Sequence, residues 1–249
     1  MYTIILNKLK NIITTGIRSD VLKVLAMILM LIDHIGSITG NIALRGIGRL
    51  AFPLFVYLSV KSLYYTSNKR KYLFNLLIFA FISEFPYDLL LHTVNKGSPV
   101  LNMKSQNVFF TFVVGIMAIE LYEKLQHSSY IENFLKMLLI CIFLGIIAEV
   151  IFRSDYGFYG VVTFGIIYLF KDNKLLLISI TPIFIMSTYV LYQISIHPEN
   201  CCRNIFLTLP MLLAYPLMAL DNNKRTKNKI FKWCGYWFYP FHQLIIALI

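Results

Sequence analysis

The sequence has few charged residues, no long polar segment and no pattern of paired cysteines. Charged side chains make up 14% of the 249 residues and hydrophobic ones 58%, whereas a soluble globular domain has about 25% charged residues. The composition therefore excludes a soluble protein. The four cysteines, Cys141, Cys201, Cys202 and Cys234, form no CxxC pair, so neither a disulfide framework nor a zinc site is predicted.

Motifs of the common soluble enzymes are also missing. The chain contains no GxSxG, HExxH or P-loop pattern in a suitable context, which argues against the usual hydrolase, metalloprotease and NTPase sites. No ligand spacing singles out a metal site. No polar domain carries interleaved basic and aromatic side chains, so we expect no nucleic-acid binding despite the formal net charge of +11.

Apolar runs separated by short charged breaks fill almost the whole chain. A run of about 20 apolar residues can cross a bilayer as a helix. The sequence therefore predicts an all-α, polytopic integral membrane helix bundle with about nine spans, at residues 21–38, 47–65, 72–91, 107–123, 134–152, 157–170, 175–196, 204–220 and 231–249. We expect residues 1–20 to form an interfacial N-terminal segment and residues 21–249 a single transmembrane domain.

The distribution of basic residues indicates the orientation of the chain in the membrane. With a cytoplasmic N-terminus, the basic residues on outer segments are limited to Arg45, Arg49, Lys96, Lys104, Arg153 and Arg203, out of 23 in the chain. Basic residues favour the cytoplasmic side of a membrane. The sequence thus predicts a cytoplasmic N-terminus. We expect a multi-pass protein of the cell membrane, the plasma or inner membrane of a bacterium.

The first span, VLKVLAMILMLIDHIG, carries Lys23 near its inner end and Asp33 with His34 near its outer end. An ionisable side chain in such a helix costs at least ~2.5 kcal/mol and usually faces the bundle interior. Histidine suits general base work near neutral pH, and a carboxylate can orient it. Alternatively, Asp33 and His34 only provide each other with a polar partner at a helix end and have no further role. Because neighbouring residues lie about 100° apart on a helix, Asp33 could also serve another helix.

Two pairs of charged residues enter the same outer layer from adjacent spans. Arg45 and Arg49 share a helix face at i and i+4, as do Glu84 and Asp88 around Pro86. The simplest explanation is ion pairing between the arginines and the acids. The sharper alternative keeps an arginine free to bind an anionic group or a developing oxyanion.

The fourth and fifth spans also place polar side chains at their outer ends. Asn107 and Thr111, again at i and i+4, could bind a substrate or hydrogen-bond another helix. Glu149 and Arg153 are spaced for a local ion pair. The turn that follows them contains Asp155 and Tyr156.

The last span contains the segment WFYPFHQL. Pro240 interrupts this helix and His242 lies two residues later, among aromatic side chains. An intramembrane histidine is a candidate functional residue. We therefore consider His242 a second candidate base or a wall of the same pocket as His34.

Six ordered blocks resemble the TraX family. They are AMILMLIDHIG, GRLAFPLFVYL, FAFISEFPYDLL, NVFFTFVVGI, DYGFYGVVTFGIIYL and WFYPFHQLIIAL, and they extend from about residue 22 to the end of the sequence. That family is associated with N-terminal acetylation of F-type pilin. A more distant likeness is to membrane acyltransferases that modify cell-surface sugars. In that class ten residues separate a basic residue from a histidine on the first helix, as they separate Lys23 from His34.

The resemblance implies transfer of an acyl group from cytoplasmic acyl-CoA, most simply acetyl-CoA, to an extracytoplasmic acceptor. The acceptor would be an amine or hydroxyl of a peptide or a glycan. The resemblance carries over to two positions, with His34 as the catalytic histidine and Lys23 towards the acyl-CoA entrance. From the residues we further expect Asp33 or Glu84 to assist His34, Arg49 to stabilise the oxyanion and Lys23 to lie near the acetyl-CoA phosphates. The expected substrate-binding residues are Arg45, Asp88, Asn107, Thr111, Asp155, Tyr156 and His242.

Two other classes of function remain open on the sequence. A proton-coupled small transporter would use the outer charges as a relay, but the internal repeats typical of such proteins are not found. A non-catalytic assembly factor for pili or envelope proteins would use the charges only to hold its helices together.

Overall fold

The computed structural model describes residues 14–94, 101, 105–126, 129–196, 198–226 and 228–248. In these residues all regular secondary structure is helical, and β-type pairing is limited to isolated bridges of Ile17 with Asp221 and Gln106 with Ser154. The predicted all-α class is therefore confirmed. Residues 1–13 of the expected interfacial segment lie outside the described residues.

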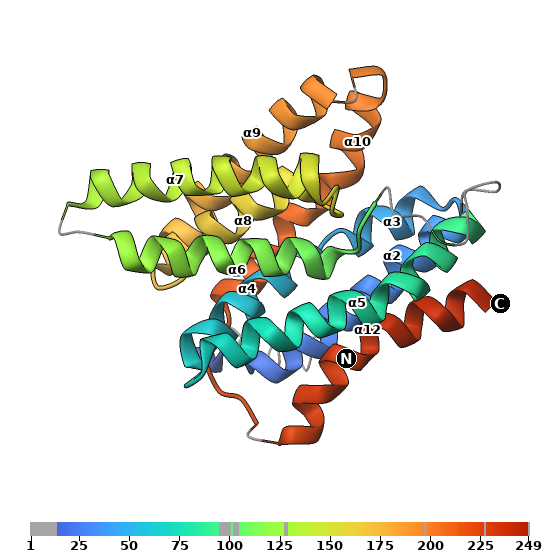
Figure 1. Ribbon diagram of the computed structural model, residues 1–249, viewed down its shortest axis with the longest axis horizontal. Helices are drawn as coiled ribbons and strands as arrows, with labels where there is room; N and C mark the ends of the chain where they lie inside the picture. The colour runs from blue at the N-terminus through green and yellow to red at the C-terminus, as the bar shows by residue number, and fades with distance from the viewer. Residues whose placement is uncertain are drawn as a thin grey trace.

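The described helices follow one another with short connections (Figure 1). In chain order they are α2 (Ser19–Thr39), α3 (Ile42–Gly48), α4 (Ala51–Tyr65), α5 (Lys69–Val94), α6 (Val108–Leu125), α7 (Tyr130–Ile146), η1 (Ile147–Ile151), α8 (Gly157–Phe170), α9 (Lys174–Ile196), η2 (Pro198–Asn200), α10 (Cys201–Thr208), η3 (Leu209–Leu213), α11 (Ala214–Ala219) and α12 (Lys229–Leu248). η1 continues α7 as a π-helical turn, and α12 contains Pro240.

Six helical segments in the described part of the chain are long and apolar enough to cross a membrane. They are Ser19–Thr39, Ile42–Tyr65, Lys69–Val94, Tyr130–Ile151, Lys174–Ile196 and Pro198–Ala219. Each coincides with a predicted span. The other three predicted spans correspond to α6, to the shorter apolar helix α8 and to α12. Nine crossings with a cytoplasmic N-terminus therefore stay a prediction.

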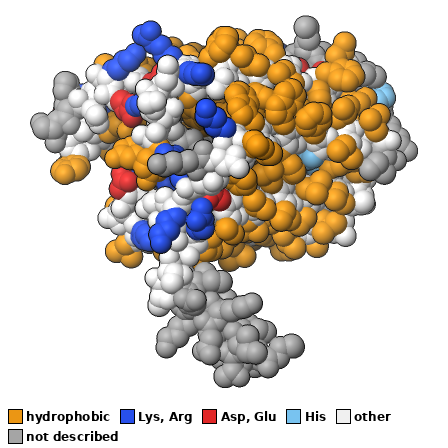
Figure 2. Space-filling model, turned by 90° about the horizontal axis from the view of Figure 1, so that it is seen from below, with side chains coloured by type: hydrophobic (Ala, Val, Ile, Leu, Met, Phe, Trp, Pro, Cys, Tyr) orange, Lys and Arg blue, Asp and Glu red, His pale blue; other side chains and the backbone are white. Residues whose placement is uncertain are grey.

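The helices form two groups that α4 joins. In Figure 1, helices α6 to α9 lie together above, and α2, α5 and α12 lie together below. α4 contacts both α2 and α8, and α5 contacts α6 across the two groups. Figure 2 shows that Lys and Arg side chains gather toward one end of the face seen from below, and that most of the remaining face is hydrophobic.

A buried carboxylate ties α2, α4 and the segment after α11 together. Asp221 is 2% exposed and accepts hydrogen bonds from the Ser19 hydroxyl at 2.9 Å and the Tyr57 hydroxyl at 3.2 Å. It also forms an ion pair with Lys61. Because removing one partner of a buried ion pair leaves the other charge uncompensated, this cluster contributes to the packing of the first described helix against the rest.

Asp221→Ala is expected to lower the free energy of unfolding by about 3–5 kcal/mol, since Lys61 would lose its partner in a mostly buried position. The measurement is thermal or denaturant unfolding in detergent, followed by circular dichroism. Asp172→Ala provides the matched control, because the Asp172 side chain is 82% exposed and such a surface change stays within about 0.5 kcal/mol. Equal stabilities of the two variants would show that the cluster does not hold the fold.

Candidate active site

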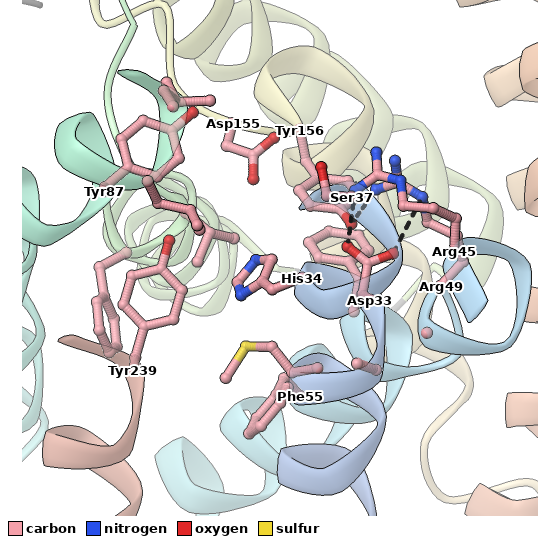
Figure 3. Close-up of a pocket in the computed structure, with 18 of the residues that line it drawn as sticks. Asp33, His34, Ser37, Arg45, Arg49, Phe55, Tyr87, Asp155, Tyr156 and Tyr239 are labelled. Atoms are coloured by element: carbon pink, nitrogen blue, oxygen red, sulfur yellow. Dashed lines mark hydrogen bonds and ion pairs between the residues drawn. The ribbon is translucent and has the colours of Figure 1, made fainter. Parts of the chain in front are cut away.

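A cavity of about 370 Å³ lies between α2, α5, α12 and the turn before α8. This volume is in the range of small-molecule sites, about 300–1,000 Å³. Much of the wall is apolar, and its polar and charged side chains are Asp33, His34, Ser37, Arg45, Arg49, Tyr87, Asp155, Tyr156 and Tyr239. In Figure 3, His34 points into the space between Tyr239, Tyr87 and Asp155.

His34 is hydrogen-bonded to His242 of α12. The distance between His34 Nδ1 and His242 Nε2 is 2.7 Å, and the ring planes lie within 7° of parallel with centroids 4.8 Å apart. Parallel rings in face-to-face contact stay about 3.5 Å apart. The shorter nitrogen–nitrogen distance therefore places the two rings edge to edge, as a hydrogen bond requires.

The contacts of His242 determine the tautomers of both neutral rings. His242 Nδ1 lies 2.7 Å from the carbonyl oxygen of Phe238, which can only accept, so Nδ1 carries the hydrogen and Nε2 is the acceptor. His34 Nδ1 must then donate to His242. This leaves Nε2 of His34 unprotonated, which is what a general base requires.

Asp33 does not orient His34. Figure 3 shows the carboxylate of Asp33 pointing away from the imidazole, toward the two arginines. Its Oδ2 lies 3.2 Å from Arg45 Nη1, and its Oδ1 lies 3.8 Å from Arg49 Nε. Of the alternatives for Asp33, service to another helix is the one observed. The expected pairing of the arginines with Glu84 and Asp88 is wrong, because the arginines of this layer pair with Asp33.

Local sequence explains why the arginines reach Asp33. Gly40, in a left-handed conformation with φ of 67°, ends α2, and the Asn41 side chain accepts hydrogen bonds from backbone N–H groups in the first turn of α3. The chain therefore reverses and lays α3 on α2. Gly48 permits this close contact, since a Cβ there would overlap Asp33.

Arg49 is held at the cavity wall by a tyrosine. Its Nη1 donates a hydrogen bond to the Tyr156 hydroxyl at 2.9 Å. The Tyr156 ring stacks on Phe52 with centroids 3.7 Å apart and planes 2° from parallel. Thr111 supports the same region, because its hydroxyl donates to the backbone carbonyl of Asp155 and lies 2.9 Å from Ser154 Oγ. The structure thus brings Arg45, Arg49, Asp155 and Tyr156 to the His34 cavity, with Thr111 behind them.

Other expected site residues lie apart from His34. The Glu84 carboxylate accepts hydrogen bonds from the backbone and side-chain N–H groups of Asn107, and Asn107 also donates to the Ala80 carbonyl at 2.7 Å. These contacts join α5 to α6. Asp88 is 2% exposed within α5, and like Glu84 and Asn107 it is absent from the cavity wall.

The expected ion pair between Glu149 and Arg153 is also replaced by other contacts. Glu149 accepts hydrogen bonds from the Phe158 backbone N–H at 3.0 Å and from the Tyr192 hydroxyl at 2.9 Å. Arg153 is exposed. Glu149 therefore connects the end of α7 to α8 and α9. Among the described residues no group of three or more His, Cys, Asp or Glu side chains is placed to hold a metal ion.

A second cavity, of about 400 Å³, opens at the end of the bundle where basic side chains gather. Its basic lining residues are Lys23, Lys61, Arg225, Lys229 and Lys232, and we call this end the basic end. The two cavities share four lining residues, Phe55, Phe109, Phe112 and Gly235. They therefore adjoin each other inside the bundle, one opening at the basic end and the other lined by His34.

Lys23 lies at the junction of the two cavities. Its Nζ donates to the backbone carbonyls of Phe231 at 3.2 Å and Lys232 at 3.4 Å. Its side chain crosses Gly235, where a Cβ would overlap it. Lys23 is thus tied to the first turns of α12, and Lys61 is paired with Asp221. The remaining basic residues of this cavity are Arg225, Lys229 and Lys232.

Sequence reasoning missed Ser37, Tyr87 and Tyr239 as cavity residues. Tyr87 lies between the two acids of ISEFPYDLL, and Tyr239 precedes His242 by three positions, so the two share a helix face. Ser37 follows His34 at the same spacing. Ser37 and Tyr239 could have been identified because each lies three residues from a candidate histidine and therefore on the same helix face as that histidine.

Comparison with known proteins agrees with the six sequence blocks. The sequence model of a family described as "TraX protein" matches residues 18–249. A protein of Dichelobacter nodosus, "Probable fimbrial assembly protein FimC, serogroup H1", is 22% identical over 245 residues, which cover 91% of this chain and 93% of that protein. No solved structure matches the chain.

Proposed function

The chain belongs to the TraX family, and from this we propose that it is a membrane-embedded acyltransferase. It takes an acetyl group from acetyl-CoA at the cytoplasmic face and transfers it to an amine presented outside, such as the N-terminus of a pilin-like peptide. The observation that carries the proposal is the pair of adjoining cavities. One opens among basic side chains, and the other is lined by a histidine with an unprotonated nitrogen.

The proposed orientation places the basic end in the cytoplasm, with nine crossings and a cytoplasmic N-terminus. Basic residues are retained on the cytoplasmic side of membranes, and the basic end collects five of them around one cavity. Acids also lie near this end: Asp221 pairs with Lys61, and Glu123 with Lys69, while Asp20 lines the cavity. His34 then lies toward the outer side.

The donor would bind along the two adjoining cavities. Arg225, Lys229 and Lys232 line the basic cavity and are available for the phosphates. Lys23 and His34 are separated by about 16 Å along α2, so the flexible arm of the donor must cross the junction at Gly235. Phe55, Phe109 and Phe112 give that junction an apolar wall suited to a thin, uncharged chain.

In the proposed reaction, the acceptor nitrogen attacks the thioester carbonyl and His34 Nε2 takes a proton from it. The new imidazolium keeps its hydrogen bond to His242, which in turn donates to the Phe238 carbonyl. His34 then returns the proton to the departing sulfur of CoA. Arg45 and Arg49 supply positive charge to the cavity wall, where it would favour the tetrahedral oxyanion.

A non-catalytic assembly role is the second candidate, because the relative from Dichelobacter nodosus is named as a fimbrial assembly protein. In that case the ion pairs and the histidine pair would only hold helices together. A small transporter would also need a cavity on each side of the membrane. Neither alternative requires acetyl-CoA, so a donor-dependent assay separates them from the acyltransferase.

The test is transfer of label from radiolabelled acetyl-CoA in inside-out vesicles that carry the protein and cognate host membranes. Protein, glycan and lipid fractions are counted separately. We expect label in the protein fraction, on peptide N-termini, and only when the chain is present. Label in the glycan fraction would support an acyltransferase whose acceptor is a hydroxyl and not an amine. If no fraction contains label that depends on the chain, the proposal is contradicted.

A further inference from the structure

The turn before α8 holds three residues in left-handed backbone conformations. They are Arg153 with φ of 49°, Tyr156 with φ of 65° and Gly157 with φ of 28°. Such a conformation is unfavourable for a residue with a side chain, because the Cβ comes too close to the following carbonyl oxygen. Strain of this kind persists where surrounding contacts enforce it, and it concentrates at functional sites. This turn carries Asp155, whose side chain lines the His34 cavity.

Several contacts hold the backbone of this turn. The Asp155 N–H donates to the Gln106 carbonyl at 2.8 Å, and the Gly157 N–H donates to the Ser154 carbonyl at 2.8 Å. The Thr111 hydroxyl donates to the Asp155 carbonyl. Tyr156 is held by the hydrogen bond from Arg49 and by stacking on Phe52. No ion pair joins the carboxylate to a described residue, and the backbone N–H of Tyr156 is near enough to donate a hydrogen bond to it. Figure 3 shows it at the His34 cavity, between Tyr87 and Tyr156.

The surroundings of Asp155 suit a carboxylate that exchanges a proton. The charged groups near it are Asp33, Arg45 and Arg49, and the nearby titratable hydroxyls are those of Tyr87, Tyr156, Tyr192 and Tyr239. Burial raises the pKa of Asp155 to about 6, although Arg49 and Arg45 act in the opposite direction. The group is therefore mostly ionised at neutral pH and can still accept a proton.

In the proposed acetyl transfer, the acceptor nitrogen loses two protons, and His34 can take only one of them. An α-amine has a pKa of about 8, so at neutral pH it arrives mainly as an ammonium, which cannot attack a carbonyl. Forming the amide removes two protons from that nitrogen. His34 takes one and returns it to the CoA sulfur, so the other needs a second base.

We propose that Asp155 binds the acceptor as an ammonium ion and removes its first proton. This inference rests on the proposed function and adds a substrate-binding base to it. The nitrogen–carbon bond forms and the carbon–sulfur bond breaks. One proton leaves through Asp155 to the outer solution, and the second passes through His34 to the sulfur, which departs as the CoA thiol.

Asp155→Asn tests the inference in detergent-solubilised protein, with acetyl-CoA and alaninamide as the acceptor probe. Formation of N-acetylalaninamide is measured by mass spectrometry from pH 6 to pH 9. At pH 6 we expect the variant to be slower than the original protein by about 100-fold or more. The deficit should shrink by about 50- to 100-fold toward pH 9, because the amine then supplies its own unprotonated form.

Asp172→Asn is the matched control, since it makes the same chemical change at an exposed carboxylate far along the chain from the cavity. It should follow the original protein at every pH. A deficit in Asp155→Asn that stays constant from pH 6 to pH 9 would contradict proton removal and indicate only a structural role. No deficit at all would overturn the inference while the proposed function stands. If the original protein forms no N-acetylalaninamide, the amine acceptor itself is wrong.

Discussion

His34→Ala is expected to abolish acetyl transfer, with a loss of at least 100-fold and up to about 10,000-fold, the range of a lost general base. The reason is that His34 Nε2 is the unprotonated nitrogen that the hydrogen bonds from Phe238 through His242 leave in the cavity. The measurement is label transfer from acetyl-CoA in the inside-out vesicles described above. Added imidazole should restore part of the activity by occupying the space of the missing ring.

His92→Ala is the control for this variant. His92 belongs to the same outer half of the bundle, at the end of α5, but does not line the cavity. It should keep its activity, and both variants should insert into the membrane in normal amounts. Full activity of His34→Ala would remove the histidine from the mechanism and favour the assembly role.

Gly235→Val should block the donor, and we expect acetyl-CoA-dependent transfer to fall by at least 100-fold. Gly235 is one of four residues that line both cavities, and a side chain there would collide with Lys23. Because the end of a lysine side chain is flexible, Lys23 can move aside into the proposed route of the donor. The backbone of α12 therefore remains intact. The measurement is the same label transfer, combined with thermal unfolding in detergent to show that the fold is retained.

Cys234→Val is the matched control for this block. It places the same β-branched side chain one position earlier on α12, where the residue is exposed and lines neither cavity. Transfer should be close to that of the original protein. Normal transfer by Gly235→Val would mean that the donor does not pass the junction, and the proposed route through the bundle would lose its role.

Local relations in the candidate site could be predicted from the sequence. Arg45 and Arg49, four residues apart, were expected to share a face, and both approach one carboxylate. The 100° step between Asp33 and His34 allowed Asp33 to serve another helix, as it does. Spacing on one helix fixes such relations because helix geometry is regular. His242 was expected to be a second base or a wall of the same pocket; it contacts His34 from another helix but is absent from the cavity wall.

Relations between helices were not predictable in the same way. The acid partner of the arginines was expected on the neighbouring span, at Glu84 and Asp88, but the reversal at Gly40 and Asn41 turned the arginines back onto α2. Hydropathy locates a span without indicating which face meets which neighbour. Tyr87 and Tyr239 were missed because a tyrosine in an apolar span carries no signal until the cavity beside it is known.

The hydrogen bond between His34 and His242 joins residues 208 positions apart, and this separation bears on how the protein is made. Contacts so distant in sequence form late, after the intervening chain has been synthesised and packed. The Asp221 cluster imposes a similar delay on the start of α2. The tautomer that would make His34 a base in the proposed reaction is therefore established only when α12 has docked. We expect premature termination or a misplaced last helix to give a membrane-inserted but inactive product.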